Sequence, residues 1–211
     1  MLNAGYKKEA LRKYEEAKEA YFKKYDETVE QSEKLKNQKQ KSVIVIKNVE
    51  AYFNTIGSKP KSFEKEVADI ADYREKYEAE YVDIEIKPWK GAVLGFGVGI
   101  LAGGLAGLGV ALVGNGLMVN SKNKKIALEA EQQAKEIRDE TYKMSKLKLK
   151  LRSEEKAISD LNDCTDILCH KLRQIPKTDF HMFTEDEVKE LFILRESALS
   201  LAKRIGEKIA L

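Results

Sequence analysis

Apolar and polar residues alternate with helical periodicity over the first part of the chain. Between residues 14 and 35, apolar or small side chains recur at steps of three and four, which places them on one helical face. Residues 43–56 continue this pattern and no proline interrupts residues 2–56, so we predict one long helix, even across the β-branched run 42–46. The predicted face consists of Tyr14, Ala17, Tyr21, Tyr25, Thr28, Ser32 and Leu35, followed by Val43, Ile46, Val49, Phe53 and Ile56.

A turn and a shorter helix are expected next. Residues 57–60 read Gly-Ser-Lys-Pro, a combination that ends one helix and starts another. The second helix is expected to fold back on the first. Residues 82–87 alternate apolar and charged side chains before Pro88, which predicts an extended connector. The apolar positions of the second helix are Phe63, Val67, Ile70, Tyr77 and Tyr81.

Beyond residue 120, apolar residues recur at every seventh position, as in a coiled coil. Pro176 should end this helix, and Thr184 with Glu187 forms a capping box that opens a last helix. The predicted fold class is all-α, with long antiparallel coiled-coil helices forming an elongated bundle around a glycine-zipper apolar segment. The predicted seam contains Ile137, Met144, Leu151, Ile158, Thr165 and Leu172, with Leu147, Leu161, Leu168 and Ile175 between them. The face of the last helix contains Val188, Leu191, Arg195, Ala198, Ala202, Ile205 and Ile209.

Residues 91–119 form the apolar segment, and no charged side chain occurs between positions 91 and 121. Glycine recurs in it at every fourth position, which forms a groove along a helix and lets another helix approach closely. Each glycine costs a helix about 1 kcal/mol relative to alanine, so an environment outside the segment must offset that cost. The groove consists of Gly91, Gly95, Gly99, Gly103 and Gly107, and the apolar bulk around it is Val93, Leu94, Ile100, Leu101, Leu105, Leu108 and Leu112.

The length of this segment permits two arrangements in a membrane. As one helix, residues 91–119 would extend roughly 44 Å, against roughly 30 Å of bilayer hydrocarbon. A single tilted crossing near residues 93–113 and a hairpin that turns at residues 103–104 both remain open. Trp89 is placed as an interfacial anchor, and lysines occur on both sides. The sequence thus divides into an N-terminal helical hairpin (1–90), the candidate membrane segment (91–119) and a C-terminal coiled-coil part (120–211).

The alternative is a soluble bundle that buries residues 91–119 as an apolar hairpin in its own core. In that case the heptads would recruit a helical protein partner, and the chain would act as a scaffold or adaptor. Association of the purified protein with liposomes distinguishes the two hypotheses.

Composition excludes several other functions. Lys and Arg total 38 against 35 Asp and Glu, a net charge of only +3 with both signs interspersed, which argues against nucleic-acid binding. Cys164 and Cys169 are interpreted as small buried thiols. His170 and His181 lack nearby acidic or thiol partners at metal-ligand spacing other than Cys169, so we expect no metal, no cofactor and no enzymatic activity. The charged N-terminal sequence predicts cytoplasmic synthesis without a cleavable signal, and residence in the cytoplasm or at the cytoplasmic membrane.

Long coiled-coil helices on both sides of a glycine-rich hydrophobic segment resemble the bacterial α-helical pore-forming proteins of the cytolysin and enterotoxin type. They are also similar to uncharacterised bacterial glycine-zipper coiled-coil proteins. The glycine row at positions 91–107 is the motif that carries the likeness. The resemblance implies an apolar tongue that is packed away in the soluble form and released at membranes. The expected partners are therefore a lipid membrane and further copies of the chain, which assemble into a homo-oligomer with pore-forming activity.

Overall fold

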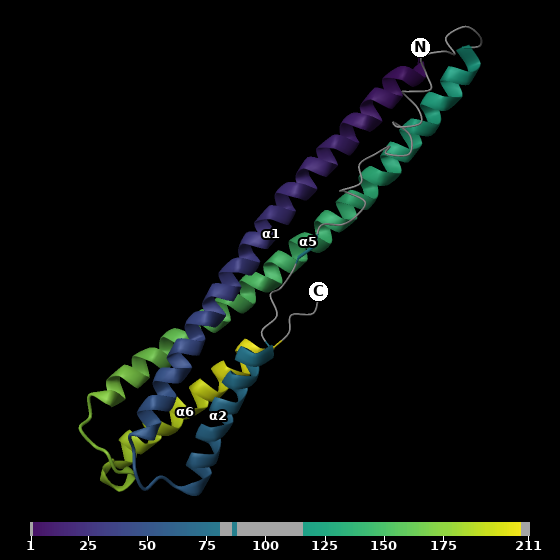
Figure 1. Ribbon diagram of the computed structural model, residues 1–211. Helices are drawn as coiled ribbons and strands as arrows, with labels where there is room; N and C mark the ends of the chain where they lie inside the picture. The colour runs from purple at the N-terminus through teal and green to yellow at the C-terminus, as the bar shows by residue number, and fades with distance from the viewer. Residues whose placement is uncertain (1, 81–85, 88–115, 208–211) are drawn as a thin grey trace. The chain divides into compact units, whose positions relative to one another are not determined.

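The computed structural model describes residues 2–80, 86–87 and 116–207, and these residues are predominantly helical (Figure 1). They contain the α-helices α1 (Leu2–Asn54), α2 (Lys61–Glu80), α5 (Gly116–Arg173) and α6 (Glu185–Gly206), with a short 3₁₀-helix, η1, at Phe180–Met182. The all-α fold class is confirmed. The β-branched residues 42–46 are helical, as the long apolar stripe predicts.

The chain forms two compact units, and both take residues from each side of the apolar segment. Unit 1 contains Met1–Glu30 and Glu85–Lys148, and unit 2 contains Gln31–Ile84 and Leu149–Leu211. The three parts predicted from the sequence are bounded by the ends of the apolar segment. The two units of the structure are instead defined by contacts between helices.

Helices of unit 2 that follow each other along the chain are antiparallel, as expected. Ion pairs Lys47–Glu78 and Arg74–Glu50 make α1 and α2 antiparallel, and Arg204–Glu154 with Lys171–Glu190 does the same for α5 and α6. In contrast, α2 and α6 are parallel, because Glu66 pairs with Arg195 and Tyr73 lies against Lys203. It follows that α1 and α5 also run in the same direction.

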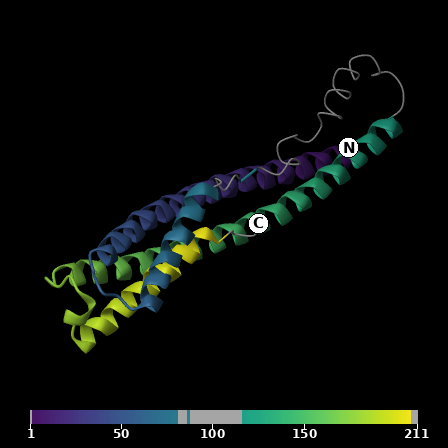
Figure 2. The same ribbon diagram turned by 60° about the horizontal axis from the view of Figure 1, so that its bottom comes forward.

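Unit 1 has the same parallel pair. Tyr6 of α1 contacts Glu131 of α5, and Thr28 further along α1 contacts Met144 further along α5. Figures 1 and 2 both show the two helices running side by side in one direction. The two helices are parallel because α2 comes between them in the chain. α2 is antiparallel to α1 and α5 is antiparallel to α2, so α5 returns to the direction of α1. The antiparallel arrangement therefore holds for helices that follow each other along the chain, and it does not extend to the pair α1 and α5.

The turn between α1 and α2 is joined to the turn before α6. Gly57 N donates to Thr178 O at 2.7 Å, and Phe180 N donates to Gly57 O at 2.9 Å. Ser58 has a positive φ of 54°, and its hydroxyl donates to the Asp179 carboxylate. The predicted stop and restart at residues 57–60 is thus confirmed, since α2 begins directly after Pro60.

The start of α6 has the predicted capping box. Glu187 N donates to Thr184 Oγ1 at 3.4 Å, and Thr184 N donates to Glu187 Oε2 at 2.6 Å. Such reciprocal bonds satisfy backbone donors that lack a partner within the helix. Pro176 follows the last residue of α5, Arg173, as expected.

An aromatic cluster forms part of the core of unit 2. The ring of Phe63 in α2 lies 5.1 Å from that of Phe53 in α1, 5.5 Å from that of Phe192 in α6 and 5.6 Å from that of Phe180 in η1. All three contacts are edge-to-face, which favours the ring quadrupoles and adds to the burial of apolar area.

Candidate functional site

The side chains predicted to contact the membrane lie outside the described residues. The structure bears on the candidate site through the residues on either side of it, Ile86 and Lys87 before it and α5 after it. The predicted residues that lie outside are Trp89, Gly91, Leu94, Gly95, Gly99, Ile100, Leu101, Gly103, Leu105, Gly107, Leu108 and Leu112.

Ile86 is the anchor on the N-terminal side of the segment. Its side chain is buried, and its carbonyl oxygen accepts a hydrogen bond of 2.8 Å from the hydroxyl of Tyr25 in α1. Both residues belong to unit 1. The predicted connector 82–87 is otherwise outside the described residues, so its extended form stays a prediction.

The C-terminal side of the segment passes into α5, which begins at Gly116 and is 58 residues long. The side chains of Lys122, Lys124 and Lys125 are exposed in its first turns. Lys125 lies 3.9 Å from Glu129, at the limit of an ion pair. Exposed positive charge therefore follows the apolar segment directly.

Small and aromatic side chains make the core of unit 1. Four α1 residues pack against four α5 residues, three of which are alanines. Alanine lets two helices approach closely, and the tyrosine rings fill the remaining space. The alanines of α5 were not identified from sequence, although they recur at steps of three and four and lead into Ile137. The cluster contains Ala10, Tyr14, Ala17, Tyr21, Ala127, Ala130, Ala134 and Ile137.

Polar contacts also join the two helices of unit 1. The Tyr6 hydroxyl donates to Glu131 Oε2 at 2.6 Å, and this hydrogen bond raises the pKa of the tyrosine. Glu27 accepts hydrogen bonds from Lys24 in α1 and from Lys148 in α5. These bonds lower the pKa of Glu27 to about 2, with Lys24 as the larger cause. The carboxylate is therefore ionised at all moderate pH values.

The predicted heptad positions on α5 are buried to different degrees. Five of them are fully buried and four are half-buried, so the stripe faces the interior of its unit as the periodicity predicts. Knobs-into-holes packing between these residues stays a prediction. The fully buried positions are Ile137, Leu151, Ile158, Thr165 and Leu172, and the half-buried ones are Met144, Leu147, Leu161 and Leu168.

Three cationic side chains are buried among the described residues of unit 2. Arg74 donates to both carboxylate oxygens of Glu50, at 2.7 and 3.0 Å, and burial of this kind needs such pairing. Arg195 lies 2.6 Å from Glu66 and stacks on the ring of Phe192 at 4.6 Å. Lys39 differs, because it donates to carbonyl oxygens at the C-terminal end of α6, Ile205 O at 2.8 Å and Glu207 O at 3.1 Å. Burial lowers the pKa of Lys39.

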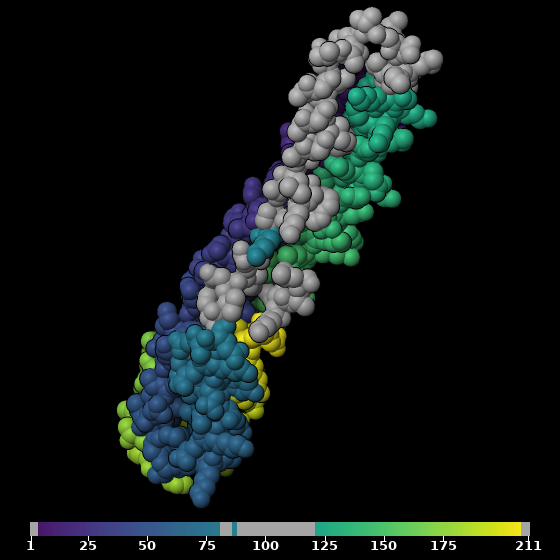
Figure 3. Space-filling model, turned by 45° about the vertical axis from the view of Figure 1, so that its right-hand side comes forward, coloured from purple at the N-terminus to yellow at the C-terminus, as the bar shows by residue number. Residues whose placement is uncertain are grey.

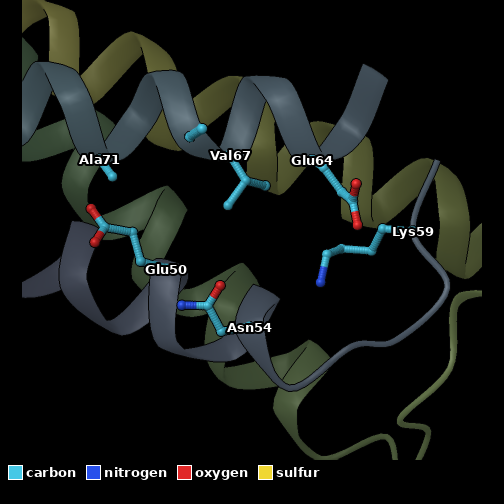
Figure 4. A pocket seen from close by; sticks show the side chains of 7 residues that line it. Glu50, Asn54, Lys59, Glu64, Val67 and Ala71 are labelled. Carbon is cyan, nitrogen blue, oxygen red and sulfur yellow. The ribbon is translucent and has the colours of Figure 1, made fainter. Parts of the chain in front are cut away.

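A shallow pocket of about 320 Å³ lies between α1 and α2 in unit 2 (Figure 4). Two of its charged groups already have structural partners, since Glu50 binds Arg74 and Lys59 donates to Phe53 O at 2.9 Å at the end of α1. The side chain of the third, Glu64, points toward Lys59. The apolar lining is confined to Val67 and two alanines, so the pocket provides little to hold a ligand.

The described residues contain no cluster of His, Cys, Asp or Glu that could hold a metal ion. Cys169 is buried, as predicted, and burial raises its pKa, whereas Cys164 is exposed and the prediction for it is wrong. Cys164 lies on the outer face of α5, a side that the heptad pattern leaves polar. Among the described helices, none combines the length and the apolar character that a bilayer crossing requires.

No protein family, curated protein or solved structure matches this chain. Its function is therefore inferred from its own residues.

Proposed function

We propose that the chain is a non-enzymatic protein that binds and enters membranes through residues 91–119. The observation that carries this proposal is the uncharged run from position 91 to position 121, which continues into a helix with exposed lysines at positions 122, 124 and 125. Apolar side chains followed by lysines match the hydrocarbon and head-group layers of a bilayer. The proposal concerns the region between the two anchors in unit 1, Ile86 and the start of α5.

The glycine row adds self-association to this proposal. Lipid chains satisfy no backbone hydrogen bonds, so the bilayer favours a helix in spite of the glycines. Small residues at every fourth position then let two such helices pack closely. We expect homo-oligomers in the membrane, and release of vesicle contents where the oligomer encloses a pore.

Substitution of glycines within and outside the row tests this mechanism. Gly95→Leu with Gly99→Leu fills the groove, and Gly97→Leu with Gly109→Leu adds the same apolar bulk away from it. Both double variants should float with vesicles, because neither loses apolar character. Only the first should lose cross-linked oligomers and dye release.

Two results would overturn the proposal in different ways. If the intact chain does not float with vesicles, membrane binding is wrong and a soluble scaffold with a helical protein partner replaces it. If the two double variants retain oligomers and dye release equally, membrane binding stands but the glycine row is not the contact between copies.

A further inference from the structure

The part of α5 in unit 1 carries a row of exposed cationic side chains on one face. They follow each other at steps of three, four and seven residues, so they share one side of the helix. Two exposed apolar side chains occur in the same row. We name this set the basic stripe, and its members are Lys124, Leu128, Lys135, Arg138, Tyr142 and Lys146.

The cations of the basic stripe have no ion-pair partner among the described residues. This holds for Lys124, Lys135, Arg138 and Lys146. In contrast, other exposed lysines pair with carboxylates three or four residues away, among them Lys13, Lys125, Lys143 and Lys189. Lys146 Nζ instead lies 4.5 Å from the centre of the Tyr142 ring. Unpaired cations on one face keep their full attraction for an anionic partner.

Carboxylates near the basic stripe reduce its positive charge without cancelling it. Glu131 falls within the row, where it is half-buried and accepts a hydrogen bond of 2.6 Å from the hydroxyl of Tyr6. Glu136 and Asp139 are exposed beside the row, and Glu136 accepts a hydrogen bond of 2.9 Å from Gln132. Because these hydrogen bonds come from uncharged donors, the three carboxylates keep their charge, and the four cations leave a small net positive charge on this face.

The two apolar members distinguish this face from an ordinary solvated helix. Leu128 is 51% exposed and Tyr142 is 62% exposed, and both lie between the cations. Figure 3 shows α5 at the molecular surface over this range. Clusters of lysine and arginine next to a membrane-entering segment attract anionic lipid head groups, and tyrosine is enriched at the membrane–water interface.

We propose that the basic stripe binds the head groups of anionic lipids, with Leu128 and Tyr142 reaching into the interfacial layer. This inference rests on the proposed function, because the apolar segment 91–119 continues into α5 and would bring it to the bilayer. It specifies the lipid class, which the apolar segment does not select. Charge complementarity favours an anionic bilayer, and the interfacial side chains favour lipid over an acidic protein.

The test compares two double variants in unit 1. Lys135→Gln with Arg138→Gln removes two charges from the basic stripe, and Lys8→Gln with Lys23→Gln removes two exposed charges from α1. Partitioning of the full-length chain is measured by sedimentation with vesicles of phosphatidylcholine alone and of equal parts phosphatidylcholine and phosphatidylserine. Circular dichroism checks that both variants retain the helical content of the wild type.

On the anionic vesicles, the stripe variant should partition about 30-fold more weakly than wild type, since each cation at the surface contributes about 1 kcal/mol. The α1 variant should stay within about threefold of wild type, and high salt should remove the difference. On phosphatidylcholine alone, all three proteins should partition equally through the apolar segment.

Other outcomes separate this inference from the proposed function. Equal partitioning of the two variants on anionic vesicles would overturn the claim that the basic stripe binds anionic lipids, and it would leave the proposed function intact. Absence of wild-type partitioning on both vesicle types would overturn both. Polyglutamate provides a further test. If it displaces the chain completely from the anionic vesicles and the chain shows no preference for lipid, the partner of the basic stripe is an acidic protein and not a lipid surface.

Discussion

Tyr25 of α1 holds the backbone of Ile86 through a hydrogen bond of 2.8 Å from its hydroxyl to the isoleucine carbonyl oxygen. The two residues are separated by 61 positions in the sequence. The bond fixes the point from which the chain continues toward the apolar segment. In a protein that releases this segment at a membrane, such a bond keeps the backbone at Ile86 in place while the residues after it are released.

Removal of the Tyr25 hydroxyl tests the importance of this anchor. Tyr25→Phe keeps the ring but leaves the Ile86 carbonyl without its donor, which should lower the free energy of unfolding by about 1 kcal/mol. Amide exchange at residues 86–87 should become faster, as measured by mass spectrometry. Tyr142→Phe is the control, because that ring is exposed, and it should leave both quantities unchanged; equal effects of the two variants would contradict the anchor.

The alanines of unit 1 give a second prediction. Ala130 is fully buried between α5 and α1, so Ala130→Leu has no space and should destabilise the protein by about 1–3 kcal/mol. Ala20 is exposed on α1, and Ala20→Leu should change stability by less than about 0.5 kcal/mol. Urea unfolding measures both, and a tolerated leucine at position 130 would show that the helices of unit 1 are not closely packed there.

The helices and most of their buried faces could be predicted from the sequence. The stripe from Tyr14 to Leu35 is buried except for Tyr25, which is half-buried, and the capping box at Thr184 forms as its residues require. These features depend on local periodicity and local hydrogen bonds, which a single sequence contains. The alanines before Ile137 were missed because alanine is compatible with both faces of a helix.

The direction of α5 relative to α1 could not be predicted in the same way. A heptad stripe buries the same residues whether its partner runs parallel or antiparallel, so Leu151 and Ile158 contain no information on direction. The buried cations Arg74 and Lys39 were also missed, because their burial depends on Glu50 and on the end of α6, which are distant in sequence. The candidate membrane residues lie outside the described residues, and their role stays a prediction.

The carboxylate of Glu27 gives a prediction for pH. Its pKa is lowered from 4.5 to about 2, mainly by Lys24 and then by Lys148, so the ionised form stabilises the folded state. This contribution is fully present above pH 4.5 and is lost as the pH falls toward 2. Lys148→Gln should raise the pKa of Glu27 toward its ordinary value, as followed by NMR titration of the side-chain carboxyl carbon.

The control for that titration is Lys143→Gln, which alters an exposed lysine of the same helix that pairs with Glu140 instead. It should leave the pKa of Glu27 where it is in the wild type. A titration of Glu27 near 4.5 in the unmodified protein would contradict the contact between α1 and α5 at this position.

Lys39 links α1 to the end of α6 in unit 2. Lys39→Met keeps much of the buried side-chain length but removes the donor to Ile205 O and Glu207 O, which should cost about 1–3 kcal/mol. Lys41 is exposed, and Lys41→Met should be nearly neutral. Thermal unfolding compares the stability of the two variants. Amide exchange in the last turn of α6 should become faster in Lys39→Met and stay unchanged in Lys41→Met.

The central claim is that residues 91–119 enter a bilayer, and fluorescence of Trp89 tests it most directly. The chain contains a single tryptophan, adjacent to the segment, so the emission needs no assignment. Addition of vesicles should shift the emission of Trp89 to shorter wavelength, and lipids brominated near the head group should quench it more than lipids brominated at the chain ends, as expected for an interfacial anchor. Emission that neither shifts nor is quenched by any brominated lipid would contradict the claim.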